Sequence, residues 1–235
     1  MKVQQNKVVI YVVAAAVAAL VLGFVGFKVL ENDGDPVAQA ASSSSAGAET
    51  TAEKIMAAVG PLGDMEMGSK DAPVVIVEYA SLTCSHCAEF DKTTLPPLKA
   101  NYIDTGKVRY ILREFPYDEF ATSAFMLSRC AGKERYFGFV DVLFKKQAEW
   151  AYSENPLAGL LAISKQGGFS EGSFDACMKN QQIFEHIRDV ATRGRTEFGV
   201  ASTPTFFVNG EKVEGALPYA EFEKVVQKHL PAEQP

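Results

Sequence analysis

A short run of β-branched apolar residues leads into a pair of cysteines at the start of a helical stretch, and this junction limits the possible folds most. Residues 74–77, Val-Val-Ile-Val, have the composition of a strand that is buried on both faces. The helical stretch reaches from about Cys84 to Tyr102, and Pro96-Pro97 must kink or break it. A buried strand followed by a helix predicts an α/β sheet, for which the chain must supply further strands.

Those further strands are predicted on both sides of a long helical block. Residues 108–115 read as a second strand that ends at Pro116. Residues 205–208 and 211–214 flank Asn209-Gly210, a dipeptide typical of the type I′ turn of a β-hairpin. A last helix is predicted after Pro218, with an apolar stripe at Phe222, Val225, Val226 and Leu230. This order predicts one sheet with helices on both faces.

The block between the second strand and the hairpin has the pattern of helices throughout. Its helical pattern is broken at Gly132, Asn155-Pro156 and Gly167-Gly168, and residues 185–198 continue it. We therefore expect an inserted helical domain over residues 117–190. The sheet domain then consists of residues 64–116 and 191–235.

The N-terminus predicts export. Residues 8–27 carry no charge and are about long enough to cross roughly 30 Å of hydrocarbon as a helix. Lys2 and Lys7 precede this run, so the positive-inside rule places the rest of the chain outside the cytoplasm. We favour an uncleaved signal-anchor over residues 1–30; a cleaved signal peptide is the alternative. Residues 31–63 are predicted as a linker, in which residues 52–59 could form a short helix.

Two classes of function are disfavoured by composition and spacing. The formal net charge is −6 and no Lys/Arg block occurs, so the chain lacks the electrostatic pattern of a nucleic-acid-binding protein. Cys84 and Cys87 could supply half a zinc site, but the other two cysteines form no second close pair, and His186 and His229 lack ligand spacing. We predict no metal and no other cofactor.

The sequence Cys84-Ser85-His86-Cys87 is suited to thiol chemistry. A gap of two residues lets the two sulfurs approach bonding distance, with the first one exposed. The free N–H groups and partial positive charge at a helix N-terminus favour a thiolate, and His86 can add positive charge or a hydrogen-bond donor. A more stable thiolate makes the disulfide a stronger oxidant. A purely structural disulfide is the alternative.

Three other features each allow a plain and a functional interpretation. Glu78 is either a strand-end side chain that reaches water or a part-buried acid that exchanges a proton with Cys87. Thr203-Pro204 is either an ordinary strand start or a cis peptide placed against the disulfide. The last two cysteines, Cys130 and Cys177, are either free buried thiols or a pair.

The same residues resemble the DsbA family of thioredoxin-fold proteins, most closely its alphaproteobacterial type. The resemblance covers about residues 64–231 and lies in Cys-x-His-Cys, in the glutamate six positions before the first cysteine, and in the Thr-Pro before the late hairpin. It implies a thioredoxin fold with an inserted helical domain.

The resemblance also implies a role for each candidate residue. Cys84 is the nucleophile, Cys87 the resolving cysteine, and His86 stabilises the reduced thiolate. Glu78 is the buried acid, Pro204 is the cis-proline, and Thr203-Pro204 contacts the substrate. Cys130 and Cys177 form a structural disulfide.

The expected function is therefore a periplasmic thiol:disulfide oxidoreductase, tethered to the inner membrane through its N-terminal helix. It introduces disulfides into unfolded or reduced exported proteins, and a quinone-linked membrane oxidase of the DsbB type regenerates it. One alternative is an isomerase or reductase of the same fold that a membrane electron donor keeps reduced. An alternative of another class is a tethered metal-binding or scaffold module.

Overall fold

The computed structural model of the chain describes residues 50–232, which belong to one compact unit. The apolar run predicted to span the membrane, residues 8–27, and most of the predicted linker lie outside the described residues. Within residues 50–232, every helix is too short or too polar to cross a membrane.

A sheet of five strands forms the centre of this unit, in the order β1-β3-β2-β4-β5. The two central strands, β2 (Val74–Ala80) and β3 (Val108–Glu114), run parallel, as a strand-helix-strand unit requires. β1 (Met65–Met67) and β4 (Thr205–Val208) pair antiparallel with them, and β5 (Glu211–Glu214) extends the sheet beyond β4. β1 was not predicted, because three residues are too few to show an alternating pattern.

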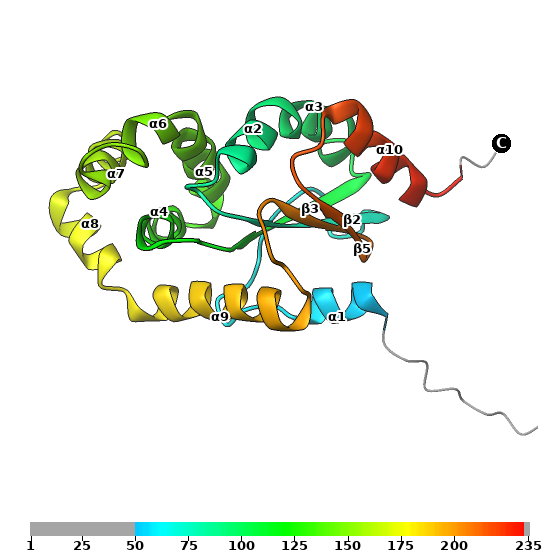
Figure 1. Cartoon of the computed structure of the whole chain (residues 1–235), viewed down its shortest axis with the longest axis horizontal. Coiled ribbons are helices and arrows are strands. Elements are labelled where there is room, and N and C mark those ends of the chain that lie inside the picture. The colour runs from blue at the N-terminus through cyan, green and yellow to red at the C-terminus, as the bar shows by residue number, and fades with distance from the viewer. Residues whose placement is uncertain (1–49, 233–235) are drawn as a thin grey trace, which may run out of the picture. The chain divides into compact units, whose positions relative to one another are not determined.

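Helices cover both faces of the sheet, which confirms the predicted α/β architecture. On one face lie α2 (Ser85–Thr93), α3 (Leu95–Leu98) and α10 (Tyr219–His229), and on the other α1 (Thr51–Ala57) and α9 (Gln181–Glu197) (Figure 1). Successive residues of β2 point to opposite faces. Ile76 therefore packs in the core with Phe90 of α2, while Val77 and Tyr79 pack with Val190 of α9.

The segment just before the sheet corrects the predicted linker. Residues 31–63 were assigned to it, but residues 50–63 are part of the folded unit. Thr50 and Glu53 form a capping box that starts α1. Ile55 of α1 is buried in the same core cluster as Val77 and Tyr79. The short helix expected over residues 52–59 forms as α1, but its packing against the sheet was not foreseen, so it was assigned to the linker.

The predicted break at Pro96-Pro97 is confirmed. α2 ends at Thr93 and α3 begins at Leu95, with the prolines in its first turn, where a missing N–H costs no helical hydrogen bond. A π-helical turn, η1 (Lys99–Ile103), follows. The break leaves α2 as a short independent helix whose N-terminus carries the two cysteines.

Between β3 and β4 the described chain is helical, with bounds that follow the local capping residues. Asp118, Asn155, Ser170 and Asn180 each accept a backbone N–H at a helix start. The elements are α4 (Glu119–Cys130), η2 (Lys133–Arg135), α5 (Tyr136–Lys145), α6 (Gln147–Trp150), α7 (Pro156–Gln166), α8 (Glu171–Met178) and α9. Because α9 runs unbroken through residue 190, the domain boundary at that position stays a prediction.

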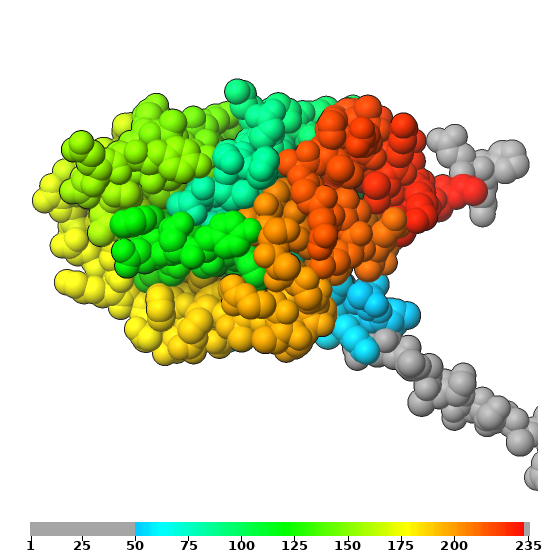
Figure 2. Space-filling view, in the orientation of Figure 1, coloured from blue at the N-terminus to red at the C-terminus, as the bar shows by residue number. Residues whose placement is uncertain are grey.

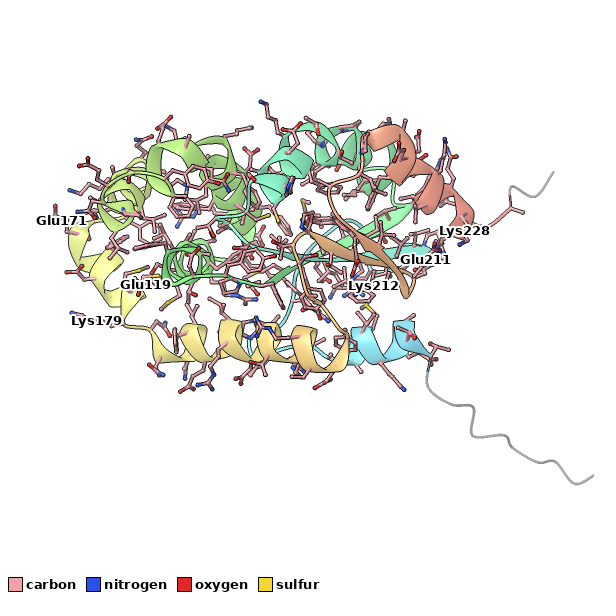
Figure 3. All side chains as sticks on the ribbon, viewed as in Figure 1. Glu119, Glu171, Lys179, Glu211, Lys212 and Lys228 are labelled. Carbon is pink, nitrogen blue, oxygen red and sulfur yellow. A yellow bond between two sulfur atoms is a disulfide. The ribbon has the colours of Figure 1, made fainter. Side chains whose placement is uncertain are left out.

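The hairpin forms at Asn209-Gly210, as predicted. Both residues have positive φ, 44° and 89°, which the type I′ turn requires. The side-chain Oδ1 atom of Asn209 also accepts a hydrogen bond from the Val75 N–H at 2.8 Å, which connects the turn to β2. β5 is an edge strand with charged side chains, and Glu211 forms an ion pair with Lys228 of α10 at 2.7 Å (Figure 3). Such charges discourage edge-to-edge pairing.

A disulfide joins Cys130, the last residue of α4, to Cys177 of α8. It closes a loop of 47 residues within the helical block. The Cα atoms are 6.1 Å apart, within the usual range for a disulfide. The bond therefore fixes two helices that are distant in sequence.

Removing this disulfide is expected to lower the free energy of unfolding. The double variant Cys130→Ala/Cys177→Ala should lose about 4 kcal/mol, because the unfolded chain regains the entropy of the open loop. Urea denaturation of both proteins, followed by circular dichroism, measures the difference. A loss below about 1 kcal/mol would show that the loop-entropy account does not apply to this bond.

Candidate active site

The N-terminus of α2 places the two cysteines in different environments. Cys84 is the N-cap residue, with extended backbone angles, and its side chain is 9% exposed. Cys87 lies in the first turn of the helix and is 0% exposed. Both are free thiols in the structure. Cys84 therefore keeps a small exposure at the helix end, while Cys87 is enclosed by the core.

Burial and hydrogen bonding separate the pKa values of the two thiols. The pKa of Cys84 is lowered to about 5. The largest cause is the hydrogen bond that the Cys87 thiol donates to the Cys84 sulfur, while burial acts in the opposite direction. The backbone N–H groups of His86 and Cys87 lower it further, as expected at a helix N-terminus. Burial raises the pKa of Cys87 well above its ordinary value, and the nearby Cys84 and Glu78 add to the rise.

The peptide bond between Thr203 and Pro204 is cis and lies against the Cys84 sulfur. Cys84 Sγ is 3.3 Å from the Thr203 carbonyl oxygen. The Thr203 N–H donates to the hydroxyl of Tyr117, which holds this loop from the other side. The buried Thr203-Pro204 peptide therefore contacts the first cysteine on one side and exposed Tyr117 through its N–H.

Glu78 lies beneath α2 on the central strand and is 3% exposed. Of the two interpretations left open for this residue, burial excludes the side chain that reaches water. The Tyr110 hydroxyl donates to its carboxyl group. Burial raises the pKa of Glu78 to about 8, with the Tyr110 hydrogen bond acting in the opposite direction. Near neutral pH the group therefore carries a proton that it can give away.

His86 is exposed, and it is its backbone N–H that contributes to the Cys84 pKa. The role predicted for its imidazole remains a prediction.

Two residues of the helical block, which the sequence did not mark as part of the site, form hydrogen bonds with the loop before α2. The buried side-chain amide of Gln147 donates to the carbonyl oxygens of Leu82 and Cys84, at 2.8 and 3.0 Å. The Tyr152 hydroxyl donates to the Thr83 carbonyl at 3.2 Å. Glutamine and tyrosine in a helical stretch have no pattern that marks such a role, so only the folded arrangement identifies them.

The low pKa of Cys84 predicts a pH-dependent absorbance and stability. Thiolate absorbance of the reduced protein should titrate with a midpoint near pH 5 instead of 9. Since folding lowers this pKa, the thiolate stabilises the reduced protein fully above pH 9 and progressively less as the pH falls through 5. Ultraviolet titration of the Cys87→Ala variant, compared with the intact reduced protein, tests the contribution of the Cys87 thiol. A midpoint near 9 in the intact protein would contradict the arrangement.

The family model described as thioredoxin matches residues 62–228, most of the chain. The crystal structure of alpha-DsbA1 from Wolbachia pipientis superimposes with a TM-score of 0.69 at 31% identity, over 76% of this chain and 95% of that one. The chain belongs to the DsbA family of thioredoxin-fold proteins. The fold predicted from the sequence, a thioredoxin fold with a helical insertion, agrees with this assignment.

Two other proteins resemble the chain over a smaller share of its length. A protein from Rickettsia typhi, named as a protein-disulfide oxidoreductase, is 36% identical over 152 residues, which make up 64% of this chain and 56% of that protein. The chain thus spans little more than half the length of this curated relative. BdbD from Bacillus subtilis shares the fold with a TM-score of 0.63 at 19% identity, over 71% of this chain and 92% of that one.

Proposed function

We propose that the chain is a thiol-disulfide oxidoreductase that introduces disulfide bonds into exported proteins through Cys84 and Cys87. The observation that supports this most is the opposed environment of the two sulfurs. A reactive disulfide needs one sulfur that substrate can reach and that leaves readily as a thiolate, and Cys84 has both properties. Cys87 is enclosed and favours its protonated form, so it does not compete for substrate.

The reaction begins from the oxidised form, with a Cys84–Cys87 disulfide. A substrate thiolate attacks Cys84 Sγ, so a substrate–Cys84 bond forms and the Cys84–Cys87 bond breaks. Cys87 leaves with the electron pair, and its high pKa means that it takes up a proton, for which Glu78 is the buried source. A second substrate thiolate then attacks the substrate sulfur of the mixed disulfide. Cys84 leaves as a thiolate, and the protein is reduced by two electrons.

Substrate would bind over Cys84, next to the Thr203-Pro204 segment that contacts its sulfur. The Thr203 N–H is occupied by Tyr117, and its carbonyl oxygen faces the Cys84 sulfur. Two exposed tyrosines contact the adjoining backbone: Tyr117 accepts the Thr203 N–H, and the Tyr152 hydroxyl donates to the Thr83 carbonyl. Aromatic side chains of this kind suit unfolded peptide, because they provide contact area without demanding a particular sequence.

The location and the partner follow from the same proposal. Residues 1–30 would carry the domain across the inner membrane and anchor it there, and residues 31–49 would connect the two. A chain that is reduced at each turnover needs an electron acceptor, and a quinone-linked membrane oxidase of the DsbB type would fill that role. Fractionation of cells expressing the full chain, with alkali extraction of the membranes, tests the anchoring.

The test of the function is transfer of the disulfide to a reduced protein. Oxidised protein is mixed with reduced, unfolded ribonuclease, and free thiols are counted over time. We expect two substrate thiols to disappear for each protein molecule reduced. If the substrate keeps its thiols while the protein stays oxidised, the proposal is wrong.

A further inference from the structure

A groove of about 350 Å³ lies beside the two cysteines, between α2 and the helices α5 and α6. Figure 2 shows α2, in blue-green, at the surface next to the green helices of the helical block. Ser85, which follows Cys84 in the chain, lines the groove. Gln147 and Tyr152, whose side chains hold the loop before α2, line it as well. The groove therefore begins next to the cysteine that substrate attacks.

The walls of the groove combine apolar surface with charged groups. Glu89 and Lys92 of α2 line it and are exposed, whereas Asp91 of the same helix is only 8% exposed. An apolar wall that contains a carboxylate suits a long side chain with an aliphatic stem and a cationic end. The apolar part comes from Ala88, Phe144 and Ala148.

The Oδ2 atom of Asp91 is buried and has no hydrogen-bond partner among residues 50–232. Unsatisfied buried polar atoms are rare in folded proteins, so this one requires an explanation. A carboxylate oxygen accepts strong, charge-assisted hydrogen bonds from guanidinium and ammonium groups. A cation bound in the groove would therefore satisfy an atom that the described part of the chain leaves without a partner.

The charged and titratable neighbours of Asp91 come from three further elements. Lys145 of α5 lines the groove, but its ammonium group pairs with Asp141 at 2.8 Å. Below α2, the Tyr110 hydroxyl of β3 donates to the Glu78 carboxyl group of β2, and both side chains are buried. None of these groups, all within the described residues, forms a hydrogen bond with Asp91 Oδ2. The carboxyl group is thus available to a ligand that enters from the groove.

The place of Asp91 along α2 indicates which residue of a substrate would reach it. Asp91 follows Ser85 by six positions, which is about 9 Å along the helix axis. An extended peptide covers that length in about three residues. A side chain about three positions from the reacting substrate cysteine would therefore lie at Asp91.

We propose that this groove is a substrate subsite for a basic side chain, above all arginine, and that the Asp91 carboxylate binds its cationic end. The inference rests on the proposed function, because exchange at Cys84 brings the substrate peptide to the start of α2. Arginine suits the groove better than lysine, since its planar guanidinium has five N–H donors and is more weakly hydrated than an ammonium group. Exported proteins with an arginine close to a cysteine are then the preferred substrates.

The ionisation of Asp91 makes the subsite dependent on pH. Burial, followed by the charge of Asp141, raises the pKa of Asp91 to about 7, with Lys145 acting in the opposite direction. A cation beside the carboxyl group favours its charged form, and binding is in turn stronger where that form prevails. The preference for arginine should therefore grow as the pH rises through 7.

The experiment measures this preference as a ratio of two rates. The oxidised full chain is mixed with a reduced cysteine peptide that carries, three positions from the cysteine on either side, arginine or its neutral isostere citrulline. Acid quenching and thiol counting follow the reaction. We expect the arginine peptide to react about tenfold faster at pH 8 in at least one of the two placements, with a ratio close to one at pH 5.

Two variants assign the preference to Asp91. Asp91→Asn should bring the ratio at pH 8 close to one, and any general change in the reactivity of the cysteines cancels because both peptides meet the same variant. Glu119→Gln removes an exposed carboxylate of α4 outside the groove and should keep the ratio. Equal rates for both peptides with the intact chain, or a ratio that survives in Asp91→Asn, would overturn the inference while leaving the proposed function in place.

A binding measurement separates the subsite from the proposed function. The arginine peptide, with serine in place of its cysteine, is added to the reduced full chain, and the Asp91 carboxyl group is titrated by carbon-13 NMR. Asp91→Asn identifies its resonance. We expect the arginine peptide to lower the pKa of Asp91 and the citrulline peptide to leave it unchanged. An unchanged pKa with both peptides overturns the inference; if the pKa falls but neither cysteine peptide is oxidised, the subsite stands and the proposed function fails.

Discussion

Replacing Cys84 with serine is expected to abolish disulfide transfer, with a fall in rate of at least about a thousandfold. A serine hydroxyl stays protonated near neutral pH and cannot form the mixed disulfide, so no intermediate remains on the pathway. Cys87→Ser should behave differently. Its Cys84 thiolate still attacks disulfides, but the resulting mixed disulfide lacks the thiol that would release it. Incubation with glutathione disulfide followed by mass spectrometry measures both results.

The two variants together test the assignment of roles. We expect glutathione to accumulate on the Cys87→Ser protein and to be absent from Cys84→Ser. Accumulation on Cys84→Ser instead would mean that Cys87 is the accessible sulfur. That outcome would contradict the burial and the pKa values of the two thiols.

The second large effect is expected at Glu114, which takes no part in the proposed redox steps. Its carboxylate is fully buried and receives hydrogen bonds from Arg129, at 2.6 and 3.1 Å, and from the Tyr136 hydroxyl at 2.9 Å. Glu114→Gln removes the charge that balances buried Arg129 and should lower the free energy of unfolding by about 3–5 kcal/mol. Urea denaturation measures the loss.

A double replacement distinguishes the charge from the packing. Replacing Glu114 and Arg129 together with methionine removes both charges, so most of the stability lost in Glu114→Gln should return. Burial raises the pKa of Glu114, but Arg129 outweighs it and the net pKa is lowered. The pair therefore stabilises the protein above the ordinary pKa of 4.5, and the stabilisation is lost as the pH falls below it. If the double variant is as unstable as the single one, the ion pair is not the cause.

The fold was largely predictable because its main elements have strong local signals. The apolar run of β2, the Asn209-Gly210 turn and the proline pair after α2 each specify one local conformation, and each forms as expected. β1 was missed because it has only three residues. The helix α1 was expected, but not its place in the fold, because that depends on the burial of Ile55 against strands that follow it in the chain.

The site was predictable for a different reason. Cys84 and Cys87 were named because of their spacing at a helix start, whereas the roles of Glu78 and Thr203-Pro204 came from the resemblance to the DsbA family. The fold brings these residues together. Gln147 could not be found in this way. A glutamine on a helix has no pattern that marks it as buried, and only the folded arrangement brings its amide to the backbone before α2.

The central claim, that the chain donates its disulfide, is tested most directly by the reduction potential of Cys84–Cys87. Equilibration with glutathione redox buffers, with trapping of free thiols and mass analysis, gives the value. A thiolate stabilised at the start of α2 favours the reduced form, so we predict an oxidising potential toward about −120 mV. A potential near about −270 mV would mean that the chain is a reductant, and the proposed direction of electron flow would be wrong.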